Sequence, residues 1–349
     1  MKMRQRPGTI LCALVTLVTT GLSIPAPVAG QTAPAGWTLP RTADGHPDLQ
    51  GVWANNNATP FERPEAWEGR ETLTDEELAA LQVAAASVVA DGDALFGDQL
   101  VLAAIAGVEA TSYDPTTGNY NQFWIAERDF SNRTSLVIDP PDGRVPDLTP
   151  AAQDRSRDAG AHRRAHPADS YTDRPQSERC VTFGVPFLSA GYNSYYQVFQ
   201  NADHVVILHE MIHDARVIPI DGQPHLADSV RQLHGDSRGH WEGDTLVIET
   251  ANYSPKTNFS PSLNGGGASD DLHIVERLTR VGPETLNYEV TITDPTTWTR
   301  PWTVMIPLRG SEDAIYEYAC HEGNIGMEGI LAGHRSEERA EPAAETGSR

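Results

Sequence analysis

The amino-acid sequence predicts a mainly β protein in which an antiparallel meander closes as a barrel or packs as a sandwich, with one or two peripheral helices. After residue 180, segments rich in β-branched and aromatic residues alternate with turns rich in Gly, Pro and Asp. Because an open meander would leave two exposed edges, we expect the sheet to close or to pack against a second sheet. The predicted strands are 195–200, 244–253, 273–281, 285–293, 302–308 and 315–320.

A single β-rich domain is expected over residues 47–335. Residues 31–46 are rich in Pro, Ala, Thr and Gly and are predicted to form a flexible lead-in, and the polar residues 336–349 a disordered tail. Gly51-Val52-Trp53 is similar to the first strand of lipocalin-like barrels, in which the Trp closes one end. This likeness implies a lipocalin-like barrel.

Helical and loop insertions are expected at about 74–180. Thr74 can cap the first helix, and Glu77 can complete a capping box with it. A second helix is predicted from Thr149-Pro150, with Pro at the first helical position, and its sequence is too polar for a central place in the fold. Between the helices, residues 133–139 form a predicted strand.

Residues 1–30 are predicted to be a signal peptide. Lys2, Arg4 and Arg6 form a basic start, an apolar run over 10–24 follows, and Val28-Ala29-Gly30 offers small residues for cleavage. The alternative is a membrane anchor, but the run falls short of the roughly 20 residues that span a bilayer. We therefore expect a periplasmic or secreted product that is not membrane-bound after cleavage.

The charge of the chain argues against two classes of partner. Its formal net charge is −22, and such a surface repels phosphate backbones and anionic lipid heads. Nucleic-acid binding and a membrane-surface role are therefore not expected. The expected partner is a small-molecule substrate or ligand, and the sequence does not indicate an oligomeric state.

Two cysteines remain once the predicted signal peptide, which contains Cys12, is removed. Cys180 and Cys320 are an even pair in a compartment that favours oxidation, so a disulfide is predicted. The alternatives are a reactive thiol or a metal ligand.

His209-Glu210-Met211-Ile212-His213 matches the zinc-protease pattern of two His flanking a Glu. On a helix, His209 and His213 would share one face and bind zinc while Glu210 activates water. The β-branched flanks favour a strand instead, on which the two His would lie about 13 Å apart at 3.3 Å per residue. No metal or other cofactor is therefore expected, and a zinc site at His209 and His213 stays the alternative.

Residues 205–218 are predicted to form a strand or a bent strand. Alternation would then place Glu210 and His213 on opposite faces. We expect the face of His209 and His213 to line the pocket, and the face of Glu210 and Arg216 to meet solvent.

Two further clusters carry polar groups. Asp236, Arg238 and His240 precede Trp241 and form either a structural ion pair at a strand entrance or a support for a catalytic His. In the last predicted strand, Tyr316, Tyr318 and Cys320 would share one face beside His321. These side chains either pack and hydrogen-bond locally or form a polar ligand site.

Five motifs resemble a broad group of uncharacterised secreted bacterial β-rich proteins. The resemblance covers most of the residues after 46, and it implies a periplasmic β protein but no particular activity. The motifs are Pro47–Trp53, Arg133–Leu136 with Asp139–Arg144, Glu210–Arg216, Gly235–Leu246 and Tyr316–Asn324.

The first functional hypothesis is an enzyme without a redox cofactor that acts on a small organic molecule by general acid–base chemistry, as a lyase, isomerase or hydrolase. Its expected catalytic residues are His213, Glu210, His240 and His321. Substrate-binding residues are expected to be Arg216, Arg238, Asp236, Trp241, Tyr316 and Tyr318. The second hypothesis is a periplasmic binding or carrier protein, and the third is the zinc hydrolase.

Overall fold

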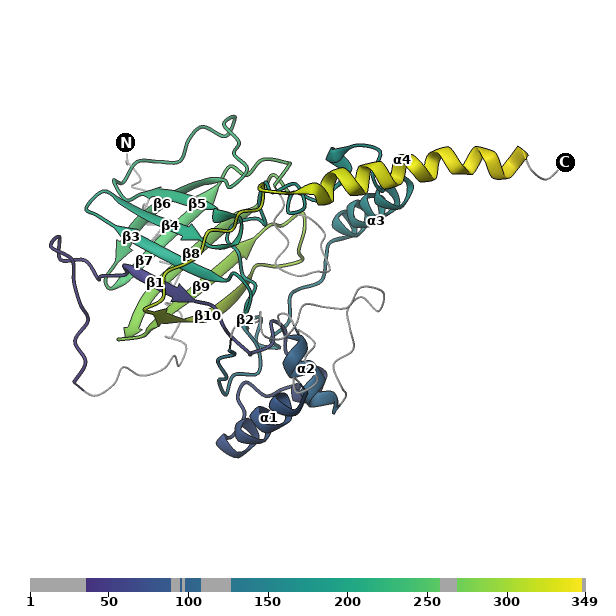
Figure 1. Ribbon diagram of the computed structural model, residues 1–349. Coiled ribbons are helices and arrows are strands. Elements are labelled where there is room, and N and C mark those ends of the chain that lie inside the picture. Colours follow the sequence, from purple (N-terminus) through teal and green to yellow (C-terminus); the bar gives the residue numbers. More distant parts are fainter. Residues whose placement is uncertain (1–35, 89–94, 96–97, 108–126, 258–268, 347–349) are drawn as a thin grey trace, which may run out of the picture. The chain divides into compact units, whose positions relative to one another are not determined.

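The computed structural model describes residues 36–88, 95, 98–107, 127–257 and 269–346 (Figure 1). The predicted signal peptide lies outside the described residues, as do residues 31–35 of the lead-in and 347–349 of the tail. Residues 36–46 of the lead-in contact the body through an ion pair of Arg41 with Asp244 and a stack of His46 on Trp241.

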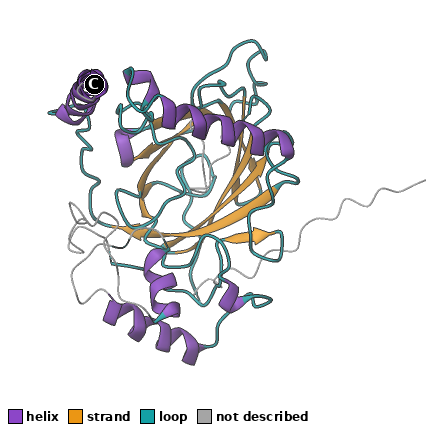
Figure 2. Ribbon diagram, turned by 90° about the vertical axis from the view of Figure 1, so that its right-hand side faces the viewer, coloured by secondary structure: helices purple, strands orange, loops and turns teal. Residues whose placement is uncertain are grey.

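The main element is a ten-stranded antiparallel sheet that is nearly closed into a barrel, which confirms the predicted mainly β fold (Figures 1 and 2). The strand order is β5-β4-β3-β1-β10-β9-β8-β7-β6, with β2 paired to β10. The strands are β1 Gly51–Ala54, β2 Val137–Asp139, β3 Tyr195–Gln200, β4 His204–His209, β5 Ala215–Pro219, β6 Asp236–Glu242, β7 Thr245–Ala251, β8 His273–Gly282, β9 Thr285–Thr293 and β10 Trp302–Ser311.

The two edge strands, β5 and β6, approach each other at Gly239. A Cβ on Gly239 would lie 2.7 Å from a methyl of Ile220 and 3.2 Å from one of Ile218. The missing side chain therefore lets the sheet curl until its edges nearly meet, which removes the exposed edges that an open meander would have.

The core fills the interior of this sheet. Alternate residues of β8, β9 and β10 are buried, so each strand sends one face inward. Fully buried members of this set include Ile274, Leu286, Ile292, Trp302 and Leu308.

Trp53 lies near the last residues of β8 and β10, where it pairs with Gly310 and is covered by Arg280. The indole is 2% exposed and donates from Nε1 to the Leu49 carbonyl at 2.9 Å. The guanidinium of Arg280 lies over its ring, 5.3 Å from the centroid. Arg280 also donates to the carbonyls of Asp48 and Pro283, so its charge stays at the rim. We call this region the Trp53 end.

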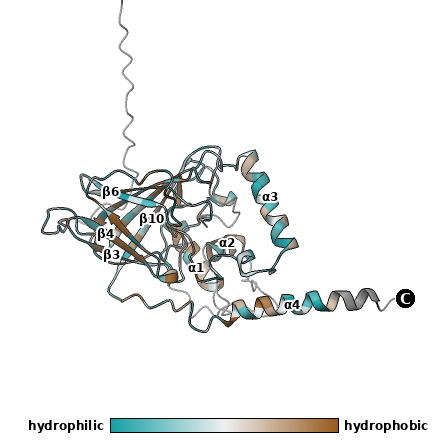
Figure 3. Cartoon of the chain, turned by 90° about the horizontal axis from the view of Figure 1, so that it is seen from above, coloured by the Kyte–Doolittle hydropathy of each residue, from teal (hydrophilic) through white to brown (hydrophobic). Residues whose placement is uncertain are grey.

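Among the residues that the structure describes, four α-helices lie outside the sheet: α1 Asp75–Val88, α2 Gln99–Ala106, α3 Pro150–Ala165 and α4 Ile325–Thr346. The predicted caps are present, since Thr74 and Glu77 exchange bonds at 2.8 and 3.3 Å and the Thr149 hydroxyl accepts from Ala152. α3 is largely hydrophilic (Figure 3). Residues 336–346 were expected in a disordered tail but belong to α4. Ion pairs such as that of Arg335 with Glu338 support the helix there.

The prediction of a strand or a bent strand over 205–218 was wrong, because the segment forms two strands joined by a turn. Between β4 and β5, a 3-10 helix over Met211–His213 reverses the chain, with positive φ at Ile212 (55°) and His213 (48°). The two strands therefore form a hairpin, and alternation restarts after the turn. As a result, His209 and Arg216 both face the interior, while His213 is exposed at the tip.

The predicted strand at 315–320 was also wrong. Residues 314–320 have no regular secondary structure. β10 is already paired with β1 and β9, and the sheet's two edges face each other, so no edge is left for a further strand.

Candidate functional site

The end of the barrel opposite Trp53 contains a buried charged pair. Both terminal nitrogens of the Arg216 guanidinium, Nη1 and Nη2, donate to the Glu276 carboxylate, at 2.6 and 2.7 Å. The Tyr288 hydroxyl donates to the same carboxylate. Burial alone would lower the pKa of Arg216, but the facing carboxylate raises it overall, so the guanidinium stays charged. We call Arg216, Glu276 and Tyr288 the internal charge network, and its groups satisfy one another.

His209 lies beside this network at the end of β4. Its ring is 4.5 Å from that of Phe187 and 4.7 Å from that of Tyr196, centroid to centroid. Nδ1 is 3.5 Å from the Met211 carbonyl, and Nε2 has no hydrogen-bond partner within the described part of the chain. Burial lowers the pKa of His209 to about 3, so the ring is neutral near pH 7 and offers an unused acceptor.

Asp214 and His234 form a second pair, nearer to solvent. His234 Nε2 lies 3.6 Å from Asp214 Oδ1, and the side chains are 26% and 9% exposed, respectively. The hydroxyl of Thr182 bridges them, at 2.6 Å from Asp214 Oδ2 and 3.0 Å from His234 Nε2. We call Asp214, His234 and Thr182 the acid–base cluster.

Burial shifts the two titratable groups of this cluster in opposite directions. It raises the pKa of Asp214 and lowers that of His234, since a low-dielectric environment disfavours either charge. The hydroxyl of Thr182 and the charge of His234 work against the shift of Asp214. Titratable groups whose pKa values are moved by burial and by each other are typical of acid–base sites, although structural pairs also show such shifts.

Exposed apolar side chains occur in the two segments that supply this cluster. Val181 and Phe183 flank Thr182 and are 40% and 39% exposed. Leu226 and Val230 lie in the segment that precedes His234 and are also exposed. Val181 and Phe183 thus place partly exposed apolar side chains next to Thr182 in the chain.

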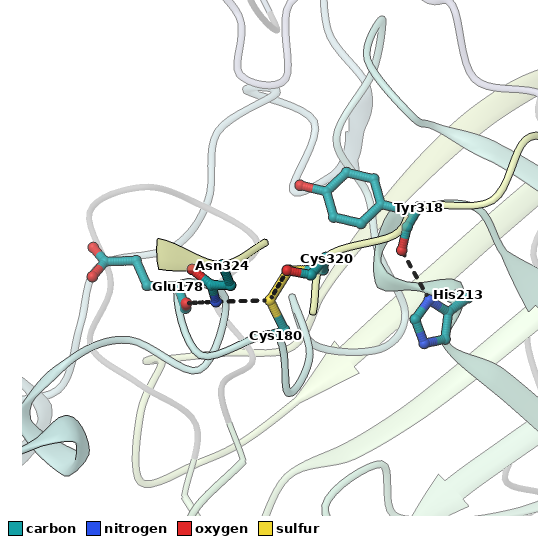
Figure 4. The surroundings of a disulfide bond; sticks show 6 residues. All are labelled: Glu178, Cys180, His213, Tyr318, Cys320 and Asn324. Atoms are coloured by element: carbon teal, nitrogen blue, oxygen red, sulfur yellow. Dashed lines mark hydrogen bonds between the residues drawn. A yellow bond between two sulfur atoms is a disulfide. The ribbon is translucent and has the colours of Figure 1, made fainter. Parts of the chain in front are cut away.

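The structure brings together part of the sequence-predicted site at the tip of the β4–β5 hairpin (Figure 4). The buried Glu210 accepts from the Tyr316 amide at 3.3 Å, and burial raises its pKa. His213 Nδ1 lies 3.1 Å from the Tyr318 carbonyl. The motifs at 210–216 and 316–324 thus meet, and the hydrogen bonds between them use the backbone groups of Tyr316 and Tyr318.

The predicted disulfide is confirmed between Cys180 and Cys320, whose Cα atoms are 5.6 Å apart. It ties the segment after β10 to the loop that carries Thr182 (Figure 4). Phe187, Met211 and Ile212 form a small buried cluster against Tyr318 and Cys320. The disulfide therefore holds residues 316–320 over the hairpin tip.

Two expectations about the hairpin were wrong. Arg216, expected to meet solvent, is buried in the internal charge network, and His213, expected in the pocket, is exposed. The helix required by the zinc-protease pattern is not formed, because His209 ends β4 and points inward while His213 lies beyond the turn. The physical reason is the chain reversal at 211–213.

The predicted polar site residues on β6 do not line the barrel interior. Asp236, Arg238 and His240 face outward, since their alternates Ser237, Gly239 and Trp241 pair with inward residues of β7. Asp236 accepts from Arg238 and from the Leu226 amide, and His240 contacts Glu242. Tyr316 and His321 are exposed. Within the described residues, no hydrogen bond or ion pair joins these side chains to the acid–base cluster.

The sequence did not predict five residues of these sites: Asp214, His234, Thr182, Glu276 and Tyr288. His234 immediately precedes the recognised motif 235–246, and Thr182 lies two residues after Cys180, so proximity to those motifs was the available signal. Glu276 had no local signal, because its partner Arg216 is 60 residues away in the chain.

Among the described residues, one group of His and carboxylate side chains is close enough to hold a metal ion: Asp169, His334 and Glu338. It lies on α4 and the loop after α3, and it shares no residue with the sites above.

Comparison with protein-family models, with curated proteins and with solved structures finds no match to this chain. In the part of the chain that the structure describes, no helix has the length and apolar character needed to cross a membrane.

Proposed function

We propose that the protein is an enzyme that binds a small organic molecule beside the acid–base cluster and moves a proton on it, without a redox cofactor. The reaction class is that of a lyase, isomerase or hydrolase. The observation that carries the proposal is the contact of His234 with Asp214 at 3.6 Å, both desolvated and bridged by one hydroxyl. We further propose that the enzyme is exported to the periplasm after cleavage near Gly30.

The hydrogen bonds suggest which atom of His234 reacts. Thr182 donates its only hydroxyl proton to the carboxylate of Asp214, so the same hydroxyl accepts from His234. Nε2 then carries the proton of the neutral ring, and Nδ1 keeps a lone pair. Nδ1 is therefore the proposed general base.

Proton transfer to Nδ1 creates an imidazolium 3.6 Å from Asp214. The carboxylate stabilises this charge and, through Thr182, holds the ring in one orientation, which is the task of the acid in a catalytic triad. The lowered pKa of His234 keeps the ring in its basic form near neutral pH. The imidazolium can then return the proton to another atom of the substrate.

A carrier protein is the second candidate. It is supported by the internal charge network, whose groups satisfy one another, and by His209 Nε2, a buried acceptor that a ligand hydroxyl could fill. In this case the acid–base cluster would only bind.

Turnover of a panel of small organic acids, esters and hydroxy compounds tests the proposal. His234→Asn and Asp214→Asn should lower kcat by roughly 100- to 10,000-fold. His240→Ala is the matched control, because His240 faces outward on β6 and should leave kcat unchanged. Melting temperatures of all variants report whether they fold.

Two results would refute the enzyme in favour of the carrier. One is a ligand that co-purifies or binds but is not converted. The other is a His234→Asn variant that changes the Kd of that ligand, with no turnover detected in the variant or in the wild type.

A further inference from the structure

The contact between α4 and the loop after α3 is built from metal-binding groups. His334 and Glu338 are four residues apart on α4 and therefore share one face of the helix. Asp169 reaches the same place from the loop, with its Oδ1 3.2 Å from His334 Nε2. Glu338 Oε1 lies 3.6 Å from the same nitrogen.

Both separations from His334 fit ligands of one ion, and the three ligand atoms all lie within 4.8 Å of one another. Zinc bonds of 2.0–2.1 Å in a tetrahedral arrangement place neighbouring ligand atoms roughly 3.3 Å apart. The Asp169–His334 distance of 3.2 Å is close to this value. The His334–Glu338 distance of 3.6 Å is long for a hydrogen bond but ordinary between two ligands of one metal.

The negative charge around His334 also favours the binding of a cation. Its side chain is 17% exposed and meets three carboxylates, those of Asp169, Glu337 and Glu338. With a proton on each ring nitrogen, His334 carries one positive charge and neutralises only one of these carboxylates. Arg335 supplies a second positive charge through its ion pair with Glu338. A divalent ion would balance the surplus.

Supporting contacts already orient the ligands. His166 Nδ1 lies 2.7 Å from the other oxygen of Asp169, and Arg335 donates to the carbonyls of Ala168 and Asp169. Metal sites commonly hold their carboxylate ligands with such outer hydrogen bonds. The two halves of the group are thus fixed before any ion binds.

We propose that Asp169, His334 and Glu338 bind a Zn²⁺ ion that clamps α4 to the loop after α3. An imidazole with two carboxylates suits zinc better than calcium or magnesium, which prefer oxygen ligands alone. The disulfide at Cys320 holds the chain just before α4, and the ion would hold the helix 14 residues further on at His334. This site is separate from the proposed acid–base cluster and does not depend on it.

Calorimetric titration of the chelator-treated protein with Zn²⁺ tests the site. The wild type should bind one ion, and His334→Ala and Glu338→Gln should each weaken binding at least 10-fold. His166→Ala, which removes only an outer contact, should weaken it by roughly 10-fold. Co²⁺ in place of Zn²⁺ should give the visible absorption of a four-coordinate site, and Zn²⁺ should raise the melting temperature of the wild type but not of His334→Ala.

Two controls locate the ion. Glu328→Gln changes an exposed carboxylate on the same helix and should bind Zn²⁺ like the wild type. His213→Ala removes a member of the zinc-protease pattern and should also bind normally. Absence of specific Zn²⁺ binding, equal binding by His334→Ala, or a loss in His213→Ala instead would each overturn the proposal. The far-ultraviolet circular dichroism of each variant shows that it is folded.

Discussion

The two ends of the barrel differ in how deeply an arginine is buried. At the Trp53 end, Arg280 stays at the rim, where it covers an indole and donates to backbone carbonyls. At the other end, Arg216 is buried against Glu276 and Tyr288. The first arrangement lets an apolar core close with its charge in contact with water. The second places charge inside the barrel next to the half-buried acid–base cluster.

This difference suggests that the two ends of the barrel have different roles. The Trp53 end needs only packing, whereas the opposite end maintains desolvated ionisable groups that cost stability unless each has a partner. Such groups are the ones that acid–base chemistry requires. The following experiments test whether the two ends differ in this way, from the largest expected effect to the smallest.

Glu276→Ala should lower the free energy of unfolding by about 4 kcal/mol, because it leaves the Arg216 charge buried without its carboxylate. Urea unfolding measures this. The triple variant Arg216→Met, Glu276→Leu, Tyr288→Phe removes the whole internal charge network and should return close to wild-type stability. A Glu276→Ala variant less than about 1 kcal/mol weaker than wild type would show that the network is not desolvated.

Replacing Cys180 and Cys320 together by Ala should cost about 3 kcal/mol, since the disulfide closes a loop over a sequence separation of 140. The loss should also be local. Amide hydrogen exchange should speed up at the hairpin tip, residues 210–214, which the segment at 316–320 covers. It should change little at the Trp53 end, and equal loosening of both ends would contradict the comparison.

Acid should destabilise the protein through His209. Its folded pKa of about 3 lies below the unfolded value of 6.5, so the unfolded chain binds the proton more readily between these values. This contribution is complete above pH 6.5 and falls as the pH decreases towards 3; at pH 4.5 the loss is about 2.5 kcal/mol.

Urea midpoints at pH 7.5 and 4.5 measure this loss. His209→Gln should show a smaller difference between the two pH values, and His213→Gln, at an exposed position, should behave like the wild type. If His209→Gln kept the full pH dependence, other groups would have to account for it. His234 is one such group, since burial lowers its pKa too.

Arg280→Ala should cost only about 1 kcal/mol, because a partly solvated guanidinium over an indole contributes little beyond its carbonyl bonds. Thermal unfolding followed by Trp fluorescence measures it. A cost as large as that of Glu276→Ala would mean that the two arginines are equally buried in energetic terms, and the comparison would fail.

The local features of the fold could be predicted from the sequence. The helix caps at Thr74 and Thr149 and the meander of β8, β9 and β10 depend on neighbouring residues, or on an alternation that any pleated strand must follow. The disulfide was predictable as well, because only two cysteines remain after the predicted signal peptide.

The site depended on the tertiary structure. The order of residues 205–218 is compatible with one long strand, but the turn at 211–213 changes which side chains face inward, so Arg216 and His213 exchange the places expected of them. Glu276 became a partner of Arg216 through closure of the barrel, and Thr182 met His234 through the loop that the disulfide holds. Alternation and capping act over a few residues and are determined by the sequence itself, whereas the pairing of Thr182 with Asp214 and of Arg216 with Glu276, 32 and 60 residues apart, is decided only when the sheet closes.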